Sequence, residues 1–167
     1  MKIQRLSIKN FRSIKELVIE LPNVCALVGP NNAGKTNILE AMRRVLMPEY
    51  GPRATHFSED DVYLRDPDKH IEISVTFGIP ISYARLKNAE PVQIATLQFA
   101  FDRYKRGDSK GQRRLEQQCL GIEGQALMVQ KTYGATGKRP DFEPLTSIPQ
   151  EVRDQVPFIH IGIDRSL

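Results

Sequence analysis

The stretch CALVGPNNAGKTNILEAM, residues 25–42, joins an apolar run to a glycine-rich turn and then to an amphipathic continuation. The turn fits the pattern GxxxxGK[ST] over residues 29–36. The apolar run predicts a buried central strand at 24–29, and the apolar spacing after the pattern predicts a helix over 37–46. A strand before the pattern and a helix after it are the context of a phosphate-binding loop, or P-loop, and make a turn that binds nothing the weaker interpretation.

The chemistry of such a loop accounts for its residue types. Glycines let backbone N–H groups turn inward around the β- and γ-phosphates, and the amino-terminal end of the helix adds partial positive charge. We expect Lys35 to neutralise phosphate charge as the catalytic residue, and the Thr36 hydroxyl to be a Mg²⁺ ligand. GTP is disfavoured, because no guanine-reading NKxD sequence occurs. The loop residues expected to bind the nucleotide are Gly29, Asn31, Asn32, Ala33, Gly34, Lys35, Thr36 and Asn37.

Alternating apolar residues predict strands on both sides of the loop in the sequence. Two of these segments, 2–11 and 14–21, precede it, and two others, 70–77 and 95–102, follow it. The later pair alternates cleanly, which is typical of antiparallel strands with one wet face. Further strands are predicted within 125–133 and 158–164, while the polar segments 103–118 and 133–149 are predicted to be exposed connections.

The composition agrees with one soluble globular domain. The chain has 167 residues, a formal net charge of +4, a pI of about 9.1 and 40% hydrophobic residues. This balance permits binding to polyanions without requiring it. Cys25 and Cys119 have neither zinc-site nor disulfide-framework spacing, and no apolar stretch approaches the roughly 20 residues that span a bilayer. We therefore expect a reducing, cytoplasmic location and no membrane partner.

The segments LSIKNFRSIKELVIEL (6–21) and LVGPNNAGKTNILEAM (27–42) together resemble the amino-terminal end of the RecF, SMC and OLD (overcoming-lysogenisation-defect) ATPases, which are relatives of the ABC ATPases. The resemblance is close over residues 1–46, and the OLD branch fits best through GPNNAGKTN and a late strand that ends in RSL. It implies an α/β fold of the P-loop NTPase (ABC/RecF-like) class, with an adjoining antiparallel β layer. The whole chain, 1–167, would be the amino-terminal lobe of the ATPase domain.

The resemblance also implies a role for Arg12, in NFRS, beside the nucleotide, although a solvated turn residue is the alternative on sequence alone. ATPases of this type complete catalysis with an LSGGQ-like signature from a second subunit, a Walker B Asp-Glu pair and a switch histidine. This sequence has no SGG and no apolar run that ends in Asp-Glu, since Arg165 follows Asp164. We therefore expect the signature and Walker B portions to be absent from 1–167. Self-association through the ATPase domain, and DNA as a partner of the full-length protein, are likewise implied.

Two charged clusters have less specific interpretations. The acidic residues within 59–68 are interpreted as a solvated loop, although Asp60 or Asp61 could still lie near the nucleotide. The basic run within 103–114 is also interpreted as a solvated loop, with contact to DNA phosphates as the alternative.

Three hypotheses about function remain. The first is the ATP–Mg²⁺-binding lobe of an ATPase that acts on DNA, either an OLD-like ATP-dependent endonuclease or a RecF/SMC-like repair protein. The second is a nucleotide-dependent dimerisation or interaction module that does not hydrolyse ATP. The third is a self-contained phosphotransferase, which would need its own base and lid arginines within these residues.

Overall fold

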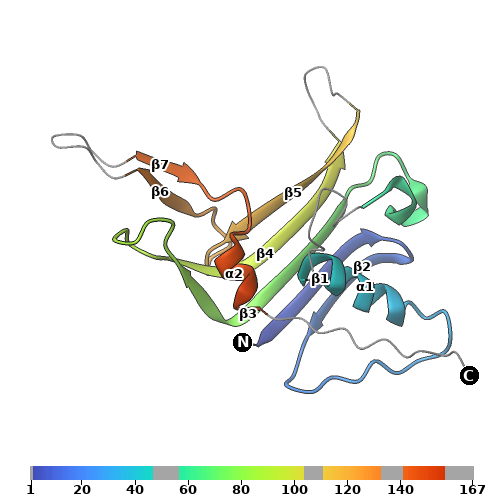
Figure 1. Ribbon diagram of the computed structural model, residues 1–167. Coiled ribbons are helices and arrows are strands. Elements are labelled where there is room, and N and C mark those ends of the chain that lie inside the picture. Colours follow the sequence, from blue (N-terminus) through green and yellow to red (C-terminus); the bar gives the residue numbers. More distant parts are fainter. Residues whose placement is uncertain (1, 47–56, 104–110, 133–140, 157–167) are drawn as a thin grey trace, which may run out of the picture.

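The computed structural model describes residues 2–46, 57–103, 111–132 and 141–156. Five antiparallel strands form one sheet in the order β2-β1-β3-β4-β5, and two further strands pair as β6-β7 (Figure 1). The strands are β1 (Ile3–Phe11), β2 (Ile14–Glu20), β3 (Ile71–Tyr83), β4 (Val92–Arg103), β5 (Arg113–Leu120), β6 (Met128–Thr132) and β7 (Asp141–Pro144). The α-helices are α1 (Lys35–Leu46) and α2 (Gln150–Asp154), and two short 3₁₀ turns, η1 (Glu59–Asp61) and η2 (Tyr63–Arg65), precede β3.

One face of the five-stranded sheet is apolar because the strand register aligns the alternating residues. Ile8 of β1 lies opposite Ile73 of β3, which lies opposite Phe99 of β4. These three side chains are at most 1% exposed. A parallel row contains Leu6, Val75, Leu97 and Cys119. The rows form the floor of the hydrophobic core, as alternation with period 2 requires.

The other face of the sheet carries polar side chains. Thr76 and Thr96 lie opposite each other with their hydroxyl oxygens 3.0 Å apart. On the same face, Gln98 donates a hydrogen bond of 2.8 Å to Glu72. The expectation of antiparallel strands with one wet face is therefore confirmed.

Both α-helices cover the apolar face (Figure 1). Ala41, Val45 and Leu46 of α1 and Val152 of α2 belong to the same core cluster as the sheet residues. None of the helices in the described part of the chain is long and apolar enough to cross a membrane.

Most of the predicted elements are present. The four early strand predictions correspond to β1, β2, β3 and β4, and the strand predicted within 125–133 is β6. The predicted helix begins two residues earlier than expected, at Lys35 rather than Asn37. The strand predicted at 158–164 lies outside the described residues.

The buried central strand predicted at 24–29 is not observed. These residues form no strand, and Val24 and Val28 are 88% and 92% exposed. A central strand needs hydrogen-bond partners along both edges and apolar cover on both faces. No described residue pairs with this segment as a strand, so its apolar composition alone does not make it one.

The two polar segments predicted as exposed connections each contain a strand. β5 begins at Arg113 inside the first, and β7 lies inside the second, where Leu145 and Ile148 are also buried. β5 pairs with β4 alone among the described strands, so its polar residues can face solvent without loss of the sheet. Cys119, near its end, is fully buried, and burial raises the pKa of its thiol to about 11.

The core of this sheet can be tested with two isoleucines of β3. We expect Ile73→Ala to lower the free energy of unfolding by about 2–5 kcal/mol, because it leaves a cavity among the buried side chains of the apolar face. Ile79→Ala is the matched control, since Ile79 is 75% exposed in the same strand and should cost less than about 0.5 kcal/mol. Urea denaturation of both variants measures the difference. Equal losses would contradict the burial of Ile73 in the core.

Candidate functional site

The glycine-rich segment forms a turn that leads directly into α1. Residues 31–34 are turn and bend, and the helix begins at Lys35. Asn32 and Gly34 have φ values of 68° and 84°, in the left-handed region. At Gly34 a side chain would be strained by the backbone and would also lie 3.3 Å from Ser13 Oγ. The sequence therefore has glycine where both the backbone and the neighbouring hairpin require it.

The ammonium group of Lys35 is held inside this loop. Its Nζ donates to the carbonyl oxygens of Gly29 and Pro30, both at 2.7 Å. α1 has no acidic residue in its first turn, so no carboxylate there neutralises the amino-terminal end of the helix. The positive charge of Lys35 and the amino-terminal end of α1 therefore both favour an anion at this loop.

A polar pocket of about 520 Å³ lies at the loop. It is lined by Asn31, Asn32, Ala33, Gly34, Lys35, Thr36, Asn37 and Ser13. All but the last were predicted from the sequence as nucleotide ligands. Gly29, the remaining loop prediction, contributes its carbonyl oxygen to Lys35 rather than lining this pocket.

Ser13 is the pocket residue that the sequence analysis missed. It lies in the tight β1–β2 turn, and its Oγ accepts a hydrogen bond of 2.8 Å from Asn37 Nδ2. The hydroxyl hydrogen of Ser13 therefore remains available to a ligand in the pocket. The signal was its position next to Arg12, in the turn that the resemblance placed beside the nucleotide.

Arg12 does not line the pocket in this structure. Its Nε donates to Asp61 Oδ1 at 2.9 Å, and a second guanidinium nitrogen lies 3.9 Å from Glu40 Oε1. The guanidinium also lies over the ring of Phe11, 5.3 Å from its centroid. Its role as a nucleotide ligand stays a prediction.

Asp61 is a buried carboxylate that joins three parts of the fold. It is 4% exposed and accepts from Arg12 and, at 2.8 Å, from Arg44 of α1. The backbone N–H of Ser58 donates to it at 3.0 Å. Burial works to raise the pKa of Asp61, but these hydrogen bonds and the arginine charges together lower it below its ordinary value.

Glu40 extends this ion cluster along α1. Hydrogen bonds from Arg43 and Arg44 lower the pKa of Glu40 to about 2 against the opposing effect of burial. Arg44 also lies over the ring of Phe57, 5.3 Å from its centroid. These carboxylates and arginines form one ion cluster between α1 and the segment before β3.

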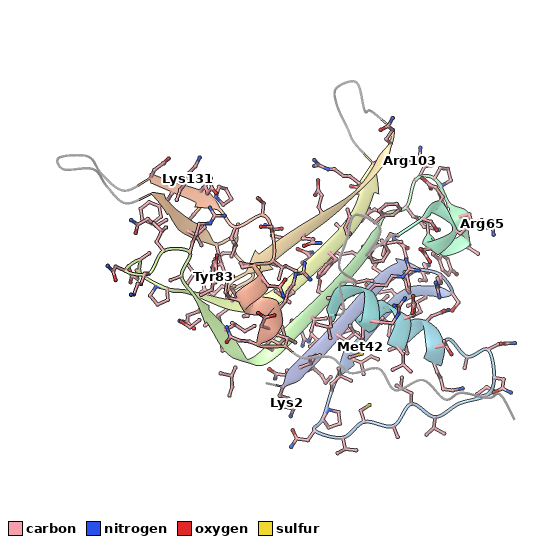
Figure 2. The ribbon with its side chains drawn as sticks, in the orientation of Figure 1. Lys2, Met42, Arg65, Tyr83, Arg103 and Lys131 are labelled. Carbon is pink, nitrogen blue, oxygen red and sulfur yellow. The ribbon has the colours of Figure 1, made fainter. Side chains whose placement is uncertain are left out.

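The interpretation of the acidic residues within 59–68 as a solvated loop is correct only in part. Asp60 is exposed and pairs with Arg65, whereas Asp61 is buried. Figure 2 shows Arg65 on this segment and Arg103 near the end of β4. The guanidinium of Arg103 lies 3.8 Å from the carboxylate of Glu59. Within the described ranges, no group of three or more His, Cys, Asp or Glu side chains is placed to hold a metal ion. Most of the basic run within 103–114 lies outside the described residues.

A second, more apolar hollow of about 490 Å³ lies on the other side of α1. It is lined in part by Ile38 and Met42 of α1, and by Cys25 and Leu27 of the unpaired segment before the loop. Cys25 is exposed. Figure 2 shows Met42 on α1, next to β1 and β2.

Comparison with known proteins adds independent information. The family model described as "AAA ATPase domain" matches residues 1–143. Endonuclease GajA of Bacillus cereus is 38% identical over 79 residues, which cover 47% of this chain and 13% of that protein. The OLD nuclease of Thermus scotoductus is 37% identical over 78 residues, covering 47% of this chain and 15% of that protein.

Shorter sequence matches, to an Smc and a RecF protein, reach the other branches of the predicted superfamily. The replication and repair protein RecF of Desulforamulus reducens is 46% identical over 43 residues, covering 25% of this chain and 12% of that protein. A solved structure from work on ATP-driven dimerization and DNA-stimulated activation of SMC ATPases is 23% identical with a TM-score of 0.47, and the likeness covers 71% of this chain and 69% of that one.

These findings agree with the resemblance inferred from the sequence, which names the RecF, SMC and OLD group. The AAA ATPase domain model covers the strands of the main sheet as well as the loop and α1. The chain therefore belongs to the AAA ATPase domain family, in the group of OLD-, RecF- and SMC-type ATPases.

Proposed function

We propose that the pocket formed by Asn31–Asn37 and Ser13 binds ATP. The observation that carries the proposal is the placement of Lys35, whose ammonium group is held by loop carbonyls at the start of α1. A phosphate group there would meet this cation, the amino-terminal end of the helix and the backbone N–H groups of the loop. Pocket volumes of roughly 300–1,000 Å³ accommodate small ligands, and this pocket lies within that range.

Mg²⁺ is the metal that this chemistry requires with ATP. Thr36 is exposed in the first turn of α1 and lines the pocket, and its hydroxyl oxygen is the hard donor that Mg²⁺ prefers. The residues therefore fit a nucleotide-bound Mg²⁺, which would share its coordination with phosphate oxygens and water. When bound, the metal neutralises phosphate charge, and Lys35 contributes to the same neutralisation from within the loop.

The wider role proposed for this chain is that of an amino-terminal lobe. The segments matched in GajA and OLD nuclease are 13% and 15% of those proteins, so the match spans only a small part of the length of these relatives. We propose that the full-length ATPase acts on DNA, as an OLD-like endonuclease or a RecF/SMC-like repair protein, and self-associates through its ATPase domain. The relatives are an endonuclease, a nuclease and a replication and repair protein, and this supports the proposal.

A second candidate is a nucleotide-dependent dimerisation module that does not hydrolyse ATP. The absence of SGG and of an apolar run ending in Asp-Glu within the 167 residues favours it for the lobe alone. Turnover by the full-length protein distinguishes the two candidates, because the 167-residue chain alone is expected to be nearly inactive under both.

The assignment of the pocket can be tested at Lys35. We expect Lys35→Ala to weaken ATP binding at least about tenfold, because it removes the cation that faces the phosphates. Lys15→Ala is the matched control, since Lys15 is exposed on β2, outside the pocket lining, and should leave the affinity unchanged. Isothermal titration calorimetry with Mg²⁺–ATP measures both. Unchanged affinity in Lys35→Ala would contradict the ATP site.

Turnover provides a separate test. The 167-residue chain should bind ATP and hydrolyse it far more slowly than the roughly 1 s⁻¹ at the low end of ordinary enzymes, because it supplies no Walker B glutamate. Phosphate release is measured for the purified chain, with Lys35→Ala as the control for contaminating ATPase. Hydrolysis at about 1 s⁻¹ or faster, lost in Lys35→Ala, would favour a self-contained enzyme.

Weak binding to DNA is expected of this chain by itself. With a net charge of +4, it should bind duplex DNA non-specifically, with dissociation constants on the order of 10⁻⁴ to 10⁻⁶ M at physiological salt. Fluorescence anisotropy with two unrelated duplexes, each at several salt concentrations, measures affinity and salt dependence. Nanomolar, sequence-selective binding would contradict the view that DNA recognition resides in other parts of the protein.

A further inference from the structure

The β1–β2 turn touches the phosphate-loop pocket on one side and a buried carboxylate on the other. Toward the pocket, Ser13 Oγ accepts the hydrogen bond from Asn37 and lines the cavity. Toward the interior, the residue immediately before it, Arg12, binds Asp61. The turn therefore links the phosphate-loop pocket to the buried carboxylate.

Asp61 holds this turn through its main chain as well as its side chain. The backbone N–H of Arg12 donates to the carbonyl oxygen of Asp61 at 2.6 Å, beside the 2.9 Å bond from the Arg12 side chain. An isolated β-bridge joins Phe11, which precedes Arg12, to Val62, which follows Asp61. Arg12 has a φ of 50°, so the turn contains a residue in a conformation that side chains disfavour and that surrounding contacts must maintain.

The same carboxylate is fixed to the helix that carries the loop. Arg44 of α1 donates to Asp61 Oδ2 at 2.8 Å and to Glu40 at 3.0 Å. Because α1 begins at Lys35, movement of the turn relative to α1 would change the position of Ser13 relative to the phosphate loop. Asp61 therefore contacts both the β1–β2 turn and α1, the two elements that contribute residues to the pocket lining.

We propose that Asp61 is a positioning residue for the phosphate pocket: it holds the β1–β2 turn against α1 so that the Ser13 hydroxyl donates a hydrogen bond to a nucleotide phosphate. Asp61 touches no ligand in this scheme. Ser13 is the contacting residue, and its free hydroxyl hydrogen is the group that Asp61 places. This inference rests on the proposed binding of ATP and adds two residues to that site.

The test measures affinity for Mg²⁺–ATP in the 167-residue chain by calorimetry. Ser13→Ala and Asp61→Asn should each weaken binding on the order of tenfold, which corresponds to the loss of one hydrogen bond to a charged group. Asp60→Asn is the matched control, because Asp60 is the adjacent carboxylate but is exposed and pairs with Arg65. It should leave affinity within about twofold, as a solvent-exposed pair contributes little.

The double variant separates positioning from a general loss of stability. If Asp61 acts through Ser13, the pair Ser13→Ala with Asp61→Asn should bind about tenfold more weakly than the unmutated chain, whereas independent effects would multiply to about a hundredfold. Far-UV circular dichroism at the titration temperature establishes that each variant is folded. Multiplicative losses would overturn the proposal, as would equal affinities for Asp61→Asn and Asp60→Asn.

Two further results have distinct meanings. Ser13 is exposed, so Ser13→Ala will fold even where Asp61→Asn does not, and unchanged affinity in Ser13→Ala alone overturns the inference. Failure of the unmutated chain to bind ATP would instead contradict the proposed nucleotide site and, with it, the inference built on that site. Binding by the unmutated chain that Lys35→Ala weakens, with no effect of Ser13→Ala, leaves the nucleotide site intact and removes only the positioning scheme.

Discussion

A single buried negative charge organises the region between the helix and the sheet. Asp61 is almost completely removed from solvent, and a carboxylate in such a place is stable only when cations and hydrogen-bond donors replace its water. Arg12 and Arg44 supply the cations, from a strand turn and a helix that are separate in sequence. Removing both arginines would leave an uncompensated charge in the interior. The relative placement of turn, helix and 3₁₀ segment is therefore fixed by electrostatic necessity as well as by apolar packing.

Aromatic rings complete that arrangement. Phe57 lies 5.9 Å from both Phe11 and Phe101, measured between ring centroids. Arg44 covers two of these rings while it binds Asp61. The arginine thus faces π-electron density on one side and a carboxylate on the other, and both attract its charge. Arg12 makes the same pair of contacts, with the ring of Phe11 and with Asp61, so the apolar core and the ion cluster meet at both arginines.

The elements that the sequence predicted well are those with a local cause. Alternation in β3 and β4, and the GxxxxGK[ST] pattern before α1, follow from neighbours in sequence. Asp61 was assigned to a solvated loop because its partners, Arg12 and Arg44, are 49 and 17 residues away. Ser13 was missed for the same reason, as only the fold brings it to Asn37. The strand predicted at 24–29 was wrong for a different reason. Apolar composition favours a strand, but a strand also needs hydrogen-bond partners, and the composition does not supply them.

The two cysteines occupy contrasting environments, which makes chemical labelling selective without mutation. Cys119 is enclosed in the core and is overwhelmingly a thiol at neutral pH, so it reacts poorly with maleimides. Cys25 is exposed and lines the apolar hollow between α1 and the unpaired segment before the loop. A thiol-reactive fluorophore would therefore label Cys25, which lies shortly before the phosphate loop in the sequence. Its emission would report directly on changes in the polarity of that hollow.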